Sequence, residues 1–129
     1  SAALRGLDVR LLVPEKSDSA IVTAAARSYF DELMQAGVRV YEYHARMLHS
    51  KTLLVDHSLA IIGTANFDNR SFRLNYEVCA IGYGTGLNAK LEDQFMADLA
   101  KSRLVERGRA QPFYQRLGDS VARLFSPLL

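Results

Sequence analysis

The sequence has little cysteine and no long apolar run, and these scarcities exclude several protein classes. Its 129 residues include one cysteine, Cys79, and no tryptophan. A single cysteine cannot form a disulfide within the chain, so a disulfide-stabilised scaffold is excluded and a reducing compartment fits. No run of about eighteen apolar residues is present, so no segment is predicted to span a membrane. No basic segment followed by an apolar stretch opens the sequence, so we expect no secretory signal.

The composition that is present is that of a folded, soluble protein. Hydrophobic residues make up 49% of the chain and charged residues 23%, which is ordinary for globular domains. A chain of 129 residues can bury roughly two thirds of its unfolded surface in one core. We therefore predict a single domain over residues 1–129.

The net charge of +2 is unevenly distributed along the chain. Residues 101–129 carry six basic and two acidic side chains, a balance of +4, whereas residues 1–100 have a balance of −2. A basic end on a near-neutral body suits contact with phosphate-rich partners, either nucleic acid or anionic lipid. A solvated helix face explains the same charges equally well.

The first third of the sequence predicts a βαβ unit. Residues 8–13 predict a short strand ended by Pro14, and residues 38–43 predict a second strand. Between them, apolar residues recur at steps of three and four up to Gly37, which is expected to end the helix. The positions in this stripe are Val22, Ala25, Tyr29, Leu33 and Ala36. Such units favour two parallel strands with the helix crossing one face.

The rest of the sequence predicts further strands and two more helices. Residues 51–55 and 59–62 are apolar at successive positions, so we expect two strands joined by a tight turn, with both faces covered. Residues 76–83 predict another strand, and the apolar spacing in residues 87–99 and 112–128 predicts helices. The predicted fold class is α/β: a mixed, largely parallel sheet flanked by helices on both faces. The last helix either packs on the domain or lies in a bilayer interface.

The residues that carry chemistry begin with His49, Lys51 and Asp56. Side chains two apart on a strand point to the same face, so His49 and Lys51 should lie together. Asp56 has the opposite parity and is expected to point away, in a supporting role. Neither His44 nor His57 is followed two residues later by a lysine, and both are interpreted as loop residues.

A second group follows at Gly63, Thr64 and Asn66. Gly63 lets backbone or ligand approach closely, and Thr64 and Asn66 are again two residues apart. A histidine that attacks or carries a proton, beside a fixed cation and a neutral donor, suits a reacting phosphoryl group. No metal is required, because the nearby acids Asp56 and Glu77 lack the histidine and cysteine company of a metal site.

These residues form a recognisable pattern. His49, Lys51 and Asp56 match HxKxxxxD, and Gly63, Thr64 and Asn66 match GTxN. Both patterns resemble the signature of the phospholipase D superfamily. The flanking segments DVRLLVPEKSD, AGVRVYEY, DNRSFRLNYEV and RLFSPLL are similar to bacterial cardiolipin synthases, so the resemblance covers nearly the whole chain.

The resemblance implies a mechanism and roles for residues. Members of this superfamily use two such motifs: one histidine attacks phosphorus to give a phosphohistidine, and the other protonates the leaving alcohol and then deprotonates the acceptor. Cardiolipin synthases of this type join two phosphatidylglycerols into cardiolipin and release glycerol, without a cofactor. Lys51, Thr64 and Asn66 are then expected to bind the substrate phosphate, and Glu77 to hydrogen-bond a catalytic histidine across the interface. The place of the motif near the end favours general acid/base chemistry for His49, with the nucleophilic role left open.

Only one motif is present in this sequence. The chain is therefore expected either to be the C-terminal half of a longer enzyme, partnered by its N-terminal half, or to form a homodimer. The resemblance implies action at the cytoplasmic side of the bacterial plasma membrane on an anionic lipid surface, with the fragment itself soluble and no nucleic acid partner. The alternative is a homodimeric single-motif phosphodiesterase or nuclease, and a non-catalytic scaffold is a third possibility. Arg70 and Arg73 are expected either to contact lipid phosphate or to form structural ion pairs.

Overall fold

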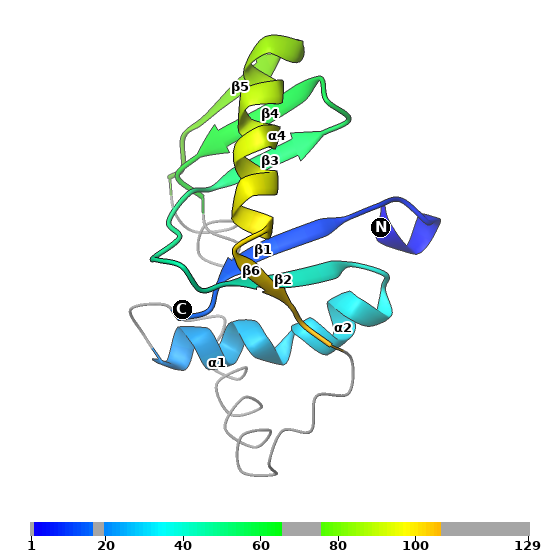
Figure 1. The fold of residues 1–129 in the computed structure, drawn as a ribbon, viewed down its shortest axis with the longest axis vertical. Helices are drawn as coiled ribbons and strands as arrows, with labels where there is room; N and C mark the ends of the chain where they lie inside the picture. Colours follow the sequence, from blue (N-terminus) through cyan, green and yellow to red (C-terminus); the bar gives the residue numbers. More distant parts are fainter. Residues whose placement is uncertain (1, 17–19, 66–75, 107–129) are drawn as a thin grey trace. The chain divides into compact units, whose positions relative to one another are not determined.

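The computed structural model describes residues 2–16, 20–65 and 76–106 (Figure 1). The predictions for Asn66, Arg70, Arg73 and the helix over residues 112–128 lie outside these residues. The described residues form two compact units: those between 2 and 48 together with 101–106, and those between 49 and 100. The single-domain organisation stays a prediction. Among the described residues, no helix has the length and apolarity to cross a bilayer.

The first unit contains the predicted βαβ arrangement. Its elements are a 3-10 helix η1 (Ala3–Arg5), strand β1 (Arg10–Pro14), helices α1 (Ala20–Ser28) and α2 (Phe30–Gln35), and strands β2 (Arg39–Tyr43) and β6 (Ser102–Leu104). The strand order is β1-β2-β6, with β1 and β2 parallel and β2 and β6 antiparallel. The parallel pair expected from the sequence is therefore confirmed.

The single helix predicted before Gly37 is in fact two helices. The amide of Tyr29 donates to the carbonyl oxygen of Ala26 at 3.2 Å, a tight turn that separates α1 from α2. At the far end, Gly37 has a φ of +95°, and the amides of Gly37 and Val38 donate to Met34 and Leu33. This double closure is the Schellman motif, in which glycine accepts the left-handed conformation at little cost.

The core of the first unit lies between α2 and the sheet. Phe30, Met34 and Val40 are buried, and partly buried side chains from β1, α2 and the chain beside β2 and β6 pack against them. These are Leu11, Val13, Leu33, Val38 and Val105. In Figure 1, α1 and α2 run along one side of β1 and β2, and Phe30 and Met34 of α2 form the core there with Val40 of β2.

A buried carboxylate joins three elements of this unit. Glu42 on β2 is 1% exposed, and it accepts hydrogen bonds from Arg27 on α1 and from Arg103 on β6, each at 3.0 Å. Arg27 also donates to the carbonyl oxygen of Glu15 at 3.2 Å. A charge this deeply buried must be paired to be tolerated. The sequence does not indicate this network, because its members are 15 and 61 residues apart.

The second unit is an antiparallel sheet with one long helix. Its elements are β3 (Thr52–Val55), β4 (Leu59–Gly63), β5 (Cys79–Tyr83) and α4 (Thr85–Leu99). β4 pairs with β3 on one side and with β5 on the other, antiparallel in both cases. The predicted mixed α/β class is confirmed. The parallel share is smaller than predicted, because β1–β2 is the one parallel pair among the described strands.

Only one face of this second sheet is covered by α4. Ala60 is 1% exposed, and its cross-strand neighbour Gly82 faces α4, where an added Cβ would stand 2.8 Å from Leu87. The opposite face carries apolar side chains that remain exposed, including Leu53 at 56%, Ile81 at 51% and Tyr83 at 82%. The prediction that both faces are covered is therefore wrong for the described residues. The apolar pattern is local, whereas what covers a face is decided by tertiary or quaternary packing.

The turn between β3 and β4 is anchored to α4. Asp56 and His57 have φ values of 46° and 57°, and the amide of Ser58 donates to Val55 at 3.1 Å, as in a type I′ hairpin. His57 Nδ1 lies 2.5 Å from Glu92 Oε2 on α4. The hydrogen bond and charge of Glu92 raise the pKa of His57, with a smaller contribution from Asp56. His57 therefore lies in a loop, as interpreted from the sequence, and its contact with Glu92 is one that no sequence pattern indicated.

The buried Glu42 gives a test of stability in the first unit. Glu42→Ala removes the shared partner of two arginines, and we expect the free energy of unfolding to fall by about 3 kcal/mol, at the low end for broken buried ion pairs. The low end applies because Arg27 and Arg103 are 33% and 54% exposed and so remain partly hydrated. Urea unfolding followed by circular dichroism measures the change. The control is Glu106→Ala at an exposed position, which should cost less than about 0.5 kcal/mol.

The His57–Glu92 pair gives a test of pH dependence. A histidine whose pKa is raised by folding adds its full stabilisation below its unfolded pKa, near 6.5, and loses it as pH rises through the folded pKa. We expect Glu92→Gln to lower the pKa of His57 and to flatten the loss of stability above pH 6.5. An NMR titration of the His57 ring measures the shift directly. An unchanged titration of His57 in Glu92→Gln would contradict the pairing.

Candidate active site

His49 and Lys51 are in direct contact just before β3. Lys51 Nζ lies 2.9 Å from His49 Nε2 and donates to the carbonyl oxygen of His49, also at 2.9 Å. The expectation that these two groups lie together is confirmed. His49 is exposed and Lys51 is half-buried, so the pair is reachable from solvent.

The contact constrains the chemistry of the imidazole. An ammonium has only donors, so Nε2 accepts from Lys51 when the ring is neutral and the ring proton is on Nδ1. Protonating Nε2 would place two cations side by side. A phosphate oxygen between them would relieve that repulsion, because it accepts from both groups. The pair is therefore suited to bind an anion such as a phosphate, and the imidazole could attack its phosphorus or transfer a proton to or from it.

Gly63 connects the histidine segment to the end of β4. Its amide donates to the carbonyl oxygen of Lys51 at 3.0 Å, which extends the β3–β4 ladder by one residue. On its other side, an added Cβ would stand 3.0 Å from the carbonyl oxygen of Val78 and 3.1 Å from Cys79 Cβ. A side chain at this position would require the neighbouring strand to move by a few tenths of an ångström, so glycine suits the close approach. The close approach expected at this position is made by backbone.

Thr64 and Glu77 form the second contact of the site. The Thr64 hydroxyl donates to Glu77 Oε2 at 2.5 Å and accepts from the amide of Val78 at 3.1 Å. The Thr64 amide donates to the carbonyl oxygen of Val78 at 3.0 Å, which extends the β4–β5 ladder. Sequence reasoning named both residues but missed their contact, since they are 13 positions apart and meet only when β4 pairs with β5.

The two contacts lie at the same end of the second sheet. Lys51 and Val78 bond to successive residues, Gly63 and Thr64, from opposite sides of the β4 segment. Because neighbouring strands are about 4.8 Å apart, the backbones of the His49–Lys51 and Glu77 segments are about 10 Å apart across β4. This end of the sheet therefore carries an imidazole and an ammonium on one side of β4, and a hydroxyl and a carboxylate on the other.

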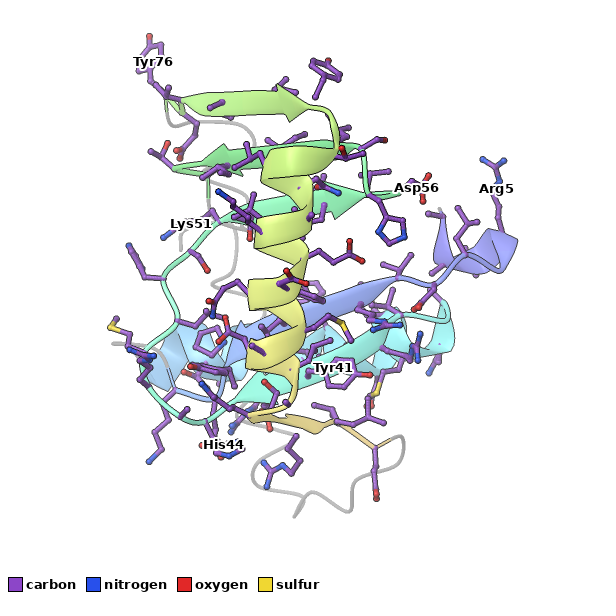
Figure 2. All side chains as sticks on the ribbon, turned by 45° about the horizontal axis from the view of Figure 1, so that its top comes forward. Arg5, Tyr41, His44, Lys51, Asp56 and Tyr76 are labelled. Atoms are coloured by element: carbon purple, nitrogen blue, oxygen red, sulfur yellow. The ribbon has the colours of Figure 1, made fainter. Side chains whose placement is uncertain are left out.

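Asp56 does not join this group. It lies in the turn at the other end of β3, and Figure 2 shows the labelled Lys51 and Asp56 at opposite ends of that strand. At a rise of about 3.3 Å per residue, the two positions are about 16 Å apart along the chain. Asp56 thus has a local effect on the turn and on His57, as the prediction of a supporting role allows. Asn66, the remaining predicted member, lies outside the described residues.

Comparison with known proteins places the chain in a family. Residues 1–99 match the family model described as "Cardiolipin synthase, PLD-like domain". A cardiolipin synthase of Alkalihalophilus pseudofirmus is 50% identical over 99% of this chain, and one of Geobacillus kaustophilus is 51% identical over the same share. Cardiolipin synthase A of Pseudomonas fluorescens is 45% identical, again over 99%. The chain spans about a quarter of the length of these relatives: 26%, 26% and 27%.

A solved structure supports the fold independently. The phospholipase D family member Nuc from Salmonella typhimurium has a TM-score of 0.67 to this chain, with coverage of 79% of this chain and 66% of that one. At 19% sequence identity, this similarity bears on the fold alone. Taken with the family model and the relatives, these findings show that the chain belongs to the phospholipase D-like domain family of cardiolipin synthases.

Proposed function

We propose that this chain supplies one of the two histidine–lysine motifs of a cardiolipin synthase. The observation that carries the proposal is the contact of His49 Nε2 with Lys51 Nζ at 2.9 Å, in a chain about 50% identical to proteins named cardiolipin synthase. The reaction joins two phosphatidylglycerols into cardiolipin and releases glycerol. The substrate is thus a phosphodiester lipid, and in the reaction a second phosphatidylglycerol replaces glycerol as the alcohol esterified to phosphorus.

The reaction proceeds in two balanced displacements. In the first, an imidazole nitrogen of one motif bonds to phosphorus, the bond from phosphorus to the glycerol oxygen breaks, and the histidine of the other motif gives that oxygen a proton. In the second, that histidine takes a proton from the hydroxyl of another phosphatidylglycerol, whose oxygen displaces the first imidazole. Either role is chemically open to His49, and the position of its motif favours the proton-transfer role.

The cation beside His49 stabilises the negative charge that develops on the phosphoryl oxygens. Lys51 Nζ is held by two contacts to His49, so it is fixed near the reacting atom before substrate binds. A preorganised donor aimed at a developing charge is among the largest contributions to catalysis. Asn66 is proposed as the neutral donor to the same oxygens. Glu77 is proposed to hydrogen-bond a catalytic histidine and so to fix its tautomer and orientation.

The second motif must come from a partner. The chain spans about a quarter of the length of its cardiolipin synthase relatives, which leaves room in such a protein for a first motif. The exposed apolar face of β3, β4 and β5, which includes Leu53 and Ile81, is the kind of surface that buries against another part of a protein. We propose the N-terminal half of the same enzyme as that partner, with a second copy of this chain as the alternative.

The place of action is proposed to be the cytoplasmic side of the bacterial plasma membrane. The substrate is a membrane lipid, so the site must work at a bilayer surface. The balance of +4 over residues 101–129 would attract the chain to anionic lipid, at roughly 1 kcal/mol for each basic side chain near the surface.

A graft tests this function. Residues 1–129 replace the aligned segment of the Geobacillus kaustophilus cardiolipin synthase, and cardiolipin and glycerol are measured from phosphatidylglycerol vesicles. We expect the graft to form cardiolipin, and His49→Ala or Lys51→Ala to lose roughly 10²- to 10⁴-fold in rate, because each removes a group that acts on the reacting phosphorus.

The matched control is His44→Ala, which removes an exposed histidine from the other unit and should leave the rate within about threefold. Circular dichroism of each variant checks that the fold is retained. Near wild-type transfer by His49→Ala would refute the assignment. The chain alone should be inactive unless it pairs, so cardiolipin formation by a strictly monomeric preparation would contradict the two-motif proposal. Cleavage of nucleic acid instead of lipid transfer would favour the phosphodiesterase alternative.

A further inference from the structure

We infer that Thr64 is a positioning residue for Glu77 and not a ligand of the substrate phosphate. The inference rests on the proposed function, since it assigns a task within the same site. It departs from the sequence-based expectation, in which the Thr64 hydroxyl shares the phosphate pocket with Lys51 and Asn66.

The Thr64 side chain has limited hydrogen-bonding capacity. A hydroxyl has a single donor, and in the structure that donor goes to Glu77 Oε2 at 2.5 Å. The hydroxyl oxygen also accepts from the amide of Val78 at 3.1 Å. A phosphate oxygen has only acceptors, so it would need the proton that Glu77 already takes. Binding phosphate through Thr64 would therefore release the carboxylate.

The backbone and side chain of Thr64 are held in place by their neighbours. Its own amide is bonded to the carbonyl oxygen of Val78, and the preceding amide, of Gly63, is bonded to Lys51. Threonine is also β-branched, which restricts χ1. The hydroxyl is thus fixed on the same backbone ladder that fixes the Lys51 segment. The Glu77 carboxylate, which accepts a hydrogen bond from this hydroxyl, is held in position by it.

The Glu77 carboxylate can accept more than one hydrogen bond. An ionised carboxylate has about four acceptor positions, so a bond from Thr64 is compatible with a further bond to an imidazole N–H. At metal sites, carboxylates that orient a histidine are commonly hydrogen-bonded in turn, and loss of such an outer partner typically costs about 10- to 100-fold in affinity or activity; we expect an effect of the same size here. Thr64 has that relation to Glu77. It acts on the reaction through Glu77, without touching the reacting atoms.

The test compares Thr64→Val, Thr64→Ser and Glu77→Gln in the grafted enzyme. Valine keeps the shape of threonine but removes the hydroxyl, and we expect kcat to fall about 10- to 100-fold while KM changes less than about threefold. Serine keeps the hydroxyl and should retain activity within about threefold. The double variant Thr64→Val/Glu77→Gln should have a kcat within about threefold of that of Glu77→Gln alone. The reason is that both changes disrupt the same Thr64–Glu77 hydrogen bond and the same function of Glu77.

Other outcomes would overturn the inference in distinguishable ways. A raised KM with unchanged kcat in Thr64→Val would indicate a direct phosphate ligand. Losses that multiply in the double variant would indicate that Thr64 does not act through Glu77. An inactive unmodified graft, or an active His49→Ala graft, would instead refute the proposed function itself.

The Thr64–Glu77 hydrogen bond can also be tested by NMR on the isolated chain, with no need for enzyme activity. In chain labelled with 13C at glutamate carboxylates, the Glu77 signal is assigned by its loss in Glu77→Gln. We expect that signal to move in Thr64→Val and to stay near its original position in Thr64→Ser. A Glu77 signal that is unmoved in Thr64→Val would refute the bond on which the inference rests.

Discussion

The site depends on the pairing of one short segment, Gly63 and Thr64, with strands on both sides of it. The Gly63 amide bonds to Lys51 and the Thr64 amide bonds to Val78, each at 3.0 Å. Through these two bonds the β4 segment holds the histidine–lysine pair on one side and Glu77 on the other. Antiparallel register is strict, because a slip of one residue turns every side chain of a strand to the opposite face. The candidate site residues are therefore positioned by backbone hydrogen bonds more than by contacts among their side chains.

The same sheet has one covered face and one exposed apolar face. One of its faces is covered by α4, and the other presents apolar side chains such as Leu53, Ile81 and Tyr83 to solvent. A phosphoryl transfer with a histidine intermediate needs a second proton-transferring group, which a single motif does not provide. The exposed face and the single motif are both consistent with the proposed partner, and the relatives are about four times the length of this chain.

Sequence reasoning predicted the parts of the fold and site that depend on local spacing. Residues two apart on an extended segment gave the contact of His49 with Lys51, and Gly37 predicted the helix end, because local geometry alone requires these features. The βαβ unit and its parallel pair followed from apolar periodicity, and the family followed from the motif.

The rest depends on pairing between distant segments. His57 meets Glu92 across 35 residues and Thr64 meets Glu77 across 13, so neither contact leaves a periodic signal in the sequence. The break at Tyr29 and the uncovered sheet face likewise result from packing, which a local pattern does not specify. The most direct test of the account is detection of scalar couplings across hydrogen bonds in chain labelled with 15N and 13C. The account predicts couplings from the Gly63 amide to the Lys51 carbonyl and from the Thr64 amide to the Val78 carbonyl. Couplings from either amide to a carbonyl one residue away would contradict it, because that register would place the Lys51 or Glu77 segment one residue out of position beside β4.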